Sequence, residues 1–477
     1  MNSNKLNILF ISSLGFLCSV TAFAAETPSA IKLSPAETQT PAPAKAADFK
    51  YPPIRLEVPE ATLNKDLKKT KEELIRSSQV FEGGIHQSGA IYHDPELDKV
   101  LNSILPIDQL GGEAKGFQYR IYVVRDPTVN AMTTPTGSIY INSGLLAALD
   151  NTDELRLTLG HEVHHILDQD IVYKFKKFKD EVGAIRVLQL IAAPAVAVAI
   201  GESDADTGRM IANVYTAADL AVSISYQLAF MGYGREDENE CDLFALKIFN
   251  QNHYDLKNAK RTFEVFDDEH KKYGKGFHSH YFDDHETGKQ RAERVQKYMN
   301  DVGYKEAADA PKVDLEYHNL TKEVRIENAR LNIKVKRPYH AIDDLEELGR
   351  LFPDDARIPC LLGQVYTMIS GDPKLLQDEL SSEEWKKQGV KDKKKQAEVW
   401  SAKAADYFNE AIRRDPAYAE PQRELGLLNE SKERFEEAII NFEKYLELNP
   451  QGKDARYVRS KISKLKDKIA KKETSKS

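Results

Sequence analysis

Apolar and polar residues follow different patterns in the two halves of the chain. Residues 62–305 mix helical periodicity with two alternating, β-rich stretches, FQYRIYVV at 117–124 and GSIYIN at 137–142. From about residue 335 onward, apolar residues recur at helical spacing only. The pattern therefore predicts a mainly helical α+β domain with a small sheet, followed by an all-α domain.

The start of the chain has the layout of an export signal. Lys5 precedes the apolar run LNILFISSLGFLCSVTAFA, which ends in the small-x-small cleavage site Ala22-Phe23-Ala24. We therefore predict a secretory signal peptide at residues 1–24, with a membrane anchor as the alternative, and a mature protein in the periplasm. Residues 25–60 are rich in Pro, Ala and Thr, which is typical of a flexible spacer.

Composition limits the function classes. A hydrophobic fraction of 41% is ordinary for a globular protein, and a net charge of -8 gives no reason to expect nucleic-acid binding. Cys18 lies in the predicted signal peptide, and Cys241 and Cys360 fall in separate predicted domains, so no disulfide framework is expected.

One apolar stretch needs a separate interpretation. VLQLIAAPAVAVAI at 187–200 is shorter than the about 20 residues that a membrane span requires. We expect a buried or substrate-shielding helical hairpin there. Contact with the membrane surface is the alternative.

The C-terminal part contains a repeat. YFNEAIRRDP at 407–416 aligns with NFEKYLELNP at 441–450, and this alignment places Phe408 over Phe442. The prolines that end the two segments are 34 residues apart, which is the period of tetratricopeptide repeats. An earlier unit at 339–366 is separated from this pair by an insertion.

These repeats define the predicted boundaries of the second half. We expect a connector at 306–335, tetratricopeptide-type helices at 336–465 and a frayed, Lys-rich tail at 466–477. Stacked helix pairs form a concave surface that usually binds peptide or protein segments. A plain helical bundle is the alternative.

The most specific motif is HEVHH at 161–165. On a helix His165 lies about 40° from His161 and His164 about 60° on its other side, so angle alone leaves both pairs open. Glu162 favours the first pair, because His-Glu-x-x-His is a zinc-binding helix whose Glu activates metal-bound water. The motif thus predicts His161 and His165 as ligands, Glu162 as general base and His164 as a spare residue.

A catalytic zinc ion usually takes a third protein ligand. The segment REDENECD at 235–242 places Glu238 and Asp242 one helical turn apart. Glu238 can bind zinc while Asp242 orients a ligand histidine from behind. The alternative is a solvated acidic run. Together with HEVHH, this segment predicts one Zn²⁺ per chain.

Residues 80–300 resemble the HtpX-type zinc metallopeptidases, which include the prenyl-protein (CAAX) endopeptidases. The matching segments are YHDPELDKVLNSIL, DPTVNAMTTPTGSIYINSGLL, TDELRLTLGHEVHHIL and REDENECD. The chain is most similar to exported bacterial members that carry tetratricopeptide repeats, the BepA type. The resemblance implies the same ligands and base, of the gluzincin type.

The resemblance also implies roles that the motifs do not. It places Ser138, Ile139 and Tyr140 in an active-site edge strand that pairs with an extended substrate. It places His285, in the segment DDHETGKQR, near the metal. Arg291 follows six residues later and is expected, like Asp242, to contact the metal ligands rather than the metal. His285 could donate to the oxyanion or act as a fourth ligand that closes the resting site, and we favour the second role.

The chain departs from the family pattern at three positions. It has Thr136 where Gly is usual, Glu286 in place of Pro and Cys241 in place of Ala. None of these changes removes a ligand. We expect Cys241 to be a small buried residue, with zinc ligation as the alternative.

The expected function is a periplasmic zinc endopeptidase. The resemblance implies quality control of envelope proteins, with misfolded or misassembled proteins as substrates. The repeats would dock the substrate or envelope assembly machinery. The alternative is a chaperone or assembly scaffold with a latent or mostly closed metal site.

Overall fold

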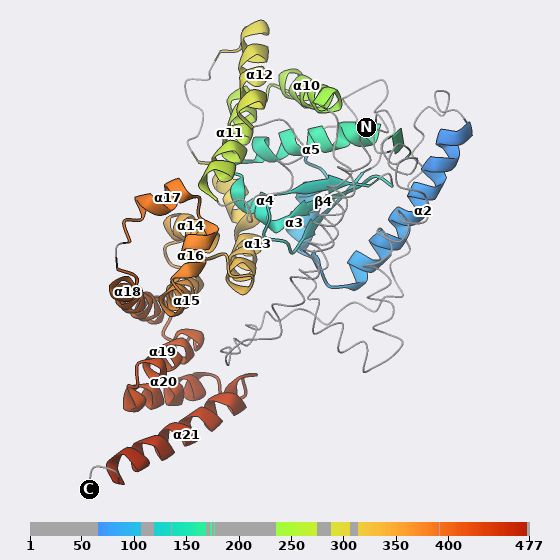
Figure 1. Ribbon diagram of the computed structural model, residues 1–477. Coiled ribbons are helices and arrows are strands. Elements are labelled where there is room, and N and C mark those ends of the chain that lie inside the picture. Colours follow the sequence, from blue (N-terminus) through green and yellow to red (C-terminus); the bar gives the residue numbers. More distant parts are fainter. Residues whose placement is uncertain are drawn as a thin grey trace, which may run out of the picture.

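The computed structural model describes residues 65–105, 119–134, 136–167, 172–173, 176, 235–273, 288–305, 313–390 and 392–474. The predicted signal peptide and spacer, the apolar run at 187–200 and His285 lie outside these residues. The described chain is mostly helical, with one four-stranded mixed sheet (Figure 1). This agrees with the expected α+β metallopeptidase domain.

The first half contains, in chain order, α2 (Lys65–Gln87), β1 (Ile91–Tyr92), α3 (Pro95–Leu101), β2 (Arg120–Val124), β3 (Ala131–Thr133), β4 (Ser138–Asn142), α4 (Ser143–Ala148), α5 (Thr152–Leu167), α10 (Arg235–Gln251), α11 (Leu256–Lys272) and α12 (Gly288–Asp301). The second half contains α13 (Leu315–Lys334), α14 (Pro338–Leu351), α15 (Arg357–Gly371), α16 (Lys374–Glu379), α17 (Ser382–Lys387), α18 (Lys393–Arg414), α19 (Glu420–Ser431), α20 (Phe435–Leu448) and α21 (Ala455–Thr474).

The two β-rich stretches of the sequence form β2 and β4, the inner strands of the sheet. The strand order is β1-β2-β4-β3. β2 and β4 pair in parallel, with Arg120 opposite Ser138, and β3 pairs antiparallel with β4. The prediction that residues 138–140 form an edge strand is therefore wrong, because both sides of β4 already have a partner. Among the described strands, β3 is the edge on this side.

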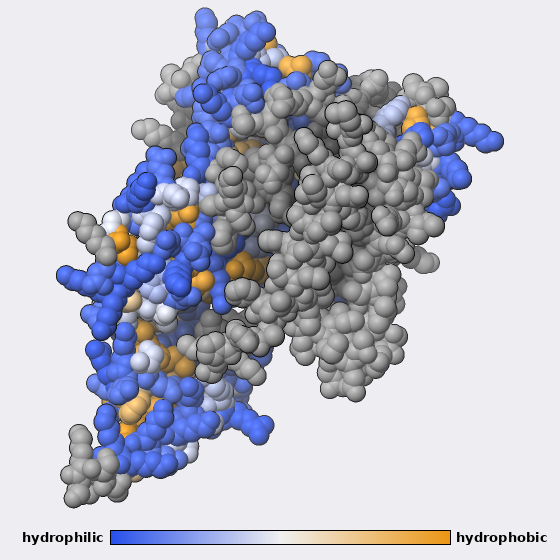
Figure 2. All heavy atoms as spheres, viewed as in Figure 1, coloured by the Kyte–Doolittle hydropathy of each residue, from blue (hydrophilic) through white to orange (hydrophobic). Residues whose placement is uncertain are grey.

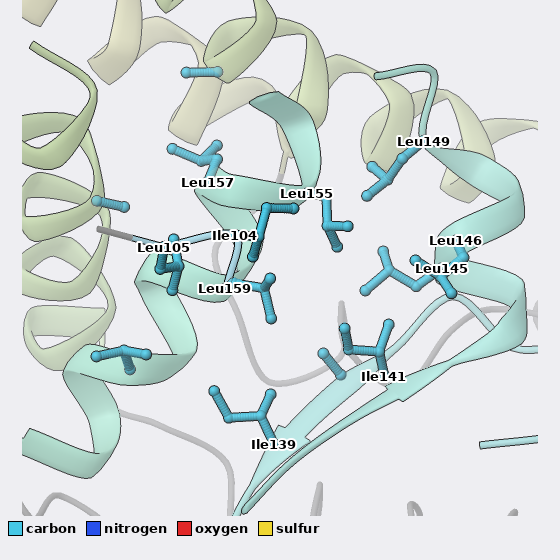
Figure 3. Packing of buried hydrophobic residues seen from close by; sticks show 14 of the residues in the cluster. Ile104, Leu105, Ile139, Ile141, Leu145, Leu146, Leu149, Leu155, Leu157 and Leu159 are labelled. Carbon is cyan, nitrogen blue, oxygen red and sulfur yellow. The ribbon is translucent and has the colours of Figure 1, made fainter. Parts of the chain in front are cut away.

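Both faces of the sheet are covered, which explains why every residue of β4 is buried. Ile139 and Ile141 point from β4 toward the leucines of α4 and α5 (Figure 3). Tyr140 lies in a separate cluster with Ile85 of α2. The alternating side chains of one strand thus join two cores, one on each face.

An apolar stripe of α5 packs against the larger of these cores. Its members are at most 3% exposed: Leu155, Leu159, Val163 and Ile166. Because this stripe faces the sheet, the histidines on the other side of α5 face the helices that follow it in the chain.

The C-terminal helices pack in pairs, α13 with α14, α15 with α18 and α19 with α20, and α21 packs on α20. A Cβ on Gly363 of α15 would lie 2.4 Å from the ring of Phe408 on α18. A Cβ on Gly426 of α19 would lie 2.4 Å from the ring of Phe442 on α20. The two phenylalanines that align in the sequence therefore make equivalent contacts. The predicted insertion holds α16 and α17.

Two expected boundaries need correction. The connector expected at 306–335 contains α13, which is packed on several sides. The Ser143 hydroxyl of α4 donates to Asn328 of α13, whose amide donates to Asp344 of α14. These buried contacts join the two halves of the molecule.

The expected frayed tail at 466–477 is helical as far as Thr474, because α21 includes it. Val458, Ile462 and Leu465 share a cluster with α20, and this apolar row anchors the helix. Within the described ranges, no helix combines the length and apolar character that a membrane span requires. The face shown in Figure 2 is mainly hydrophilic over the described helices, with small separate apolar spots.

Candidate metal centre

The centre forms where α5 and α10 approach each other closely. A Cβ on Gly160 of α5 would lie 3.3 Å from the Cβ of Ala245 on α10, so glycine at this position allows the close packing. The next residue of α5 is His161, and His165 follows one turn later. The helix pair thus brings the HEVHH motif against the segment that carries Glu238.

Three polar groups converge between these helices. Nε2 of His161 lies 3.1 Å from Nε2 of His165 and 3.2 Å from Oε2 of Glu238. Nε2 of His165 lies 3.5 Å from Oε1 of Glu238. All three side chains are buried.

The donor set fits a zinc ion. Tetrahedral zinc with ligand bonds of 2.0–2.2 Å places its ligand atoms roughly 3.3–3.6 Å apart. The observed separations of 3.1–3.5 Å are close to this range. Two imidazole nitrogens and one carboxylate are also the ligand types of catalytic zinc sites. The structure therefore brings together the residues that the sequence predicted as ligands.

Asp242 contacts the ring nitrogen of His161 that faces away from the candidate metal position. Its Oδ1 lies 3.0 Å from Nδ1 of His161, on the side of the ring away from Glu238. A carboxylate that accepts from Nδ1–H leaves the lone pair on Nε2, where a metal would bind. This is the arrangement expected for Asp242 from the helical spacing.

Arg291 of α12 fixes Asp242 in turn. Its Nε donates to Oδ2 over 3.0 Å and its Nη2 donates to Oδ1 over 2.6 Å. The guanidinium also lies 4.2 Å from the ring centroid of Phe263 on α11. Gly288 allows this placement of α12, because a Cβ there would lie 2.3 Å from the carbonyl oxygen of Phe263.

Burial and neighbouring charges set the protonation of the centre. Burial raises the pKa of Glu162 to about 7, a value suited to a general base near neutral pH. Burial alone would lower the pKa of His161, but the carboxylates of Glu238 and Asp242 raise it to about 9. Burial opposes ionisation of Asp242, but Arg291 and His161 hold its pKa well below its usual range.

Two contacts at the centre were not predicted. Arg294 of α12 donates from Nη2 to Oδ2 of Asp242 over 3.0 Å. It lies three residues after Arg291, so helical spacing could have indicated it. Cys241 is buried as expected, but its Sγ also lies 3.2 Å from Nδ1 of His165.

Cys241 also qualifies by distance as a third metal-binding group. Suitable donor atoms of His161, His165 and Cys241 lie within 4.8 Å of one another. We favour Glu238, because its carboxylate lies within 3.5 Å of Nε2 on both histidines. The sulfur contacts the opposite nitrogen of His165.

Of the residues expected to bind substrate, Ser138 and Tyr140 lie inside the sheet rather than at its edge. The Tyr140 hydroxyl is 3.5 Å from Nε2 of His86, on the α2 side of the sheet. Sequence periodicity could identify the strand but not its two neighbours.

Comparison with known proteins shows which proteins the chain is similar to. Residues 93–299 match the model of peptidase family M48. Residues 93–299 therefore form a domain that is similar to this family. This domain agrees in extent with the resemblance expected over residues 80–300, and it includes every described group of the metal centre. M48 metallopeptidases are metal-dependent, and the donor groups described above could hold a metal ion.

Two curated relatives match part of the chain. The mitochondrial metalloendopeptidase OMA1 of Schizosaccharomyces pombe is 22% identical over 220 residues, which cover 45% of this chain and 56% of that protein. The mitochondrial metalloendopeptidase OMA1 of Danio rerio is 31% identical over 71 residues, which cover 15% of each chain. The matches thus span about half, or less, of these relatives, and they support a metalloprotease.

Proposed function

We propose that this chain is a zinc-dependent endopeptidase of the gluzincin type. The convergence of His161, His165 and Glu238 within 3.5 Å of one another carries the proposal. Zinc held by these groups would act as a Lewis acid on the scissile carbonyl and acidify its water. The M48 match over residues 93–299 supports the same reaction class.

Residues of the chain would transfer the proton and orient the metal ligands. Glu162, buried and with its pKa raised to about 7, would take a proton from the attacking water and deliver it to the leaving amine. Asp242 would hold His161 in the tautomer with its lone pair on Nε2, and Arg291 would keep Asp242 ionised.

The substrate would pair with β3 rather than β4. β3 has one partner in the described sheet and packs next to α5. An extended peptide can add to such an edge through main-chain hydrogen bonds. The proposed substrate-binding segment is therefore Ala131–Thr133.

We further propose that the enzyme acts in the periplasm on misfolded or misassembled envelope proteins. The signal-peptide pattern at 1–24 supports export. The repeated Gly–Phe contact in two helix pairs and the 34-residue spacing support tetratricopeptide-type repeats of the BepA kind. These repeats would dock substrates or assembly machinery, and residues 187–200 would contribute any contact with the membrane surface.

A cleavage assay tests the enzymatic proposal. We expect purified protein without residues 1–24 to cleave an unfolded casein, to lose this activity on removal of metal by a chelator, and to regain it with zinc. Cleavage that a chelator does not affect would contradict the metal mechanism. A folded, zinc-loaded protein that cleaves no protein or peptide would favour the scaffold alternative.

A truncation tests the docking role of the last helices. α20 and α21 share a core cluster of their own, whereas Leu425 and Leu428 of α19 belong to the cluster of α14, α15 and α18. The core around the M48 domain contains no residue of α19–α21, so ending the chain after Asp415 leaves that core intact. We expect cleavage of a short peptide to stay unchanged and capture of a large unfolded protein to weaken by at least about tenfold, because a second binding site is lost. Equal cleavage of large substrates by both chains would show that these helices do not dock substrate.

A further inference from the structure

Cys241 occupies a position at the metal centre that the proposed mechanism does not use. It is fully buried, and its Sγ lies 3.2 Å from Nδ1 of His165 and 3.4 Å from Nδ1 of His164. We propose that Cys241 is a positioning residue that fixes the ring of His165, as Asp242 fixes the ring of His161. This inference rests on the proposed zinc site.

The helical spacing of α10 explains how one helix reaches both histidines. Glu238, Cys241 and Asp242 lie at relative positions 0, 3 and 4, which fall on one face. Glu238 contacts the Nε2 atoms of His161 and His165, and the next two residues on this face contact their Nδ1 atoms. Each ring is therefore contacted from both sides by α10.

The chemistry of the thiol suits this role. A histidine that presents the Nε2 lone pair to a metal carries its proton on Nδ1, and this N–H can donate to the sulfur of Cys241. The thiol hydrogen can then be donated to Nδ1 of His164. His164 is half-buried and packs against the ring of Phe244, with a centroid distance of 4.8 Å.

This arrangement gives His164 a role other than metal binding. The short chain of contacts runs from His165 through Cys241 to His164. Sulfur is a weak acceptor, so we expect a smaller effect than that of the carboxylate of Asp242. An alanine at position 241 would remove the contact, and a serine would offer a hydroxyl oxygen to the same N–H.

Direct ligation by the thiolate is the competing explanation. Its distances to the two histidine donors are compatible with a metal site. The geometry favours positioning, because Sγ contacts Nδ1 of His165 while Nε2 of the same ring lies 3.1 Å from Nε2 of His161. The two roles differ in whether sulfur bonds to the metal.

The experiment compares the zinc dissociation constants of the full mature chain and of Cys241→Ala and Cys241→Ser, measured by competition with a chelator. Cys360→Ala is the matched control, because Cys360 is equally buried but lies on α15. We expect about tenfold weaker zinc binding in Cys241→Ala, the lower end of the range for outer partners of a metal ligand. Cys241→Ser should recover most of this loss, and Cys360→Ala should bind like the original chain.

The absorption spectrum of the cobalt-substituted chain separates positioning from ligation. We expect no intense sulfur-to-cobalt charge-transfer band in the original chain. Such a band, lost in Cys241→Ser, would overturn positioning in favour of ligation. Unchanged zinc affinity in Cys241→Ala, or no recovery in Cys241→Ser, would overturn the inference and leave the zinc site standing. A folded original chain that binds no zinc would overturn the site itself.

Discussion

Glu162→Gln is expected to lower peptide hydrolysis by at least about two orders of magnitude while the protein keeps its metal. The amide has the size of the carboxylate and a similar helix propensity, so α5 should keep its packing. It cannot accept a proton, which is the role that the raised pKa of about 7 suits. Hydrolysis of a peptide and zinc content should be measured on the same preparation.

Glu240→Gln is the matched control for this change. Glu240 is exposed on α10, two residues after Glu238, and its substitution should change hydrolysis by no more than about twofold. Near-normal turnover in Glu162→Gln would mean that another group activates the water. A loss of zinc in Glu162→Gln would assign the effect to the metal site instead.

His161→Ala and Glu238→Ala are expected to remove most of the zinc, and His164→Ala is expected to retain it. His161 and Glu238 belong to the three residues that converge. Losing either should weaken zinc binding by more than about 100-fold, the upper end of the range for residues that only orient a metal ligand. His164 contacts Cys241 and Phe244 instead. Its substitution should therefore change zinc affinity only modestly.

The measurement is the zinc content of each purified variant after dialysis, with circular dichroism to confirm folding. Comparable zinc loss in His164→Ala and His161→Ala would show that the ligand pair is chosen wrongly. Full zinc retention in Glu238→Ala would favour another third ligand, with Cys241 the nearest alternative.

The grouping of the candidate metal ligands could be predicted from the sequence because these residues follow local helical spacing. The four-residue steps from His161 to His165 and from Glu238 to Asp242 each fix which side chains share a helix face. The structure supplies what spacing cannot, the packing of α5 on α10 that brings Glu238 within 3.5 Å of both histidines.

The sheet order could not be predicted in the same way. Alternation identified β2 and β4 as strands, but the parallel pairing of these strands and the position of β3 are long-range contacts. The edge strand was misassigned for this reason.

The connector and the tail were predicted wrongly because both segments are rich in polar residues and yet form packed helices. α13 buries polar residues in hydrogen-bonded pairs, such as Arg325 with Glu347, so its sequence looks like a polar connector. In α21 the many lysines hide the short apolar row of Val458, Ile462 and Leu465. In both cases tertiary packing, rather than local composition, determines the helix.

The most direct test of the central claim is a zinc titration of metal-free protein, followed by casein cleavage. If His161, His165 and Glu238 hold one zinc ion that supports hydrolysis, activity should rise with added zinc and reach its plateau at one equivalent per chain. Full activity before any zinc is added, or an equal rise in a Glu238→Ala chain, would contradict the account.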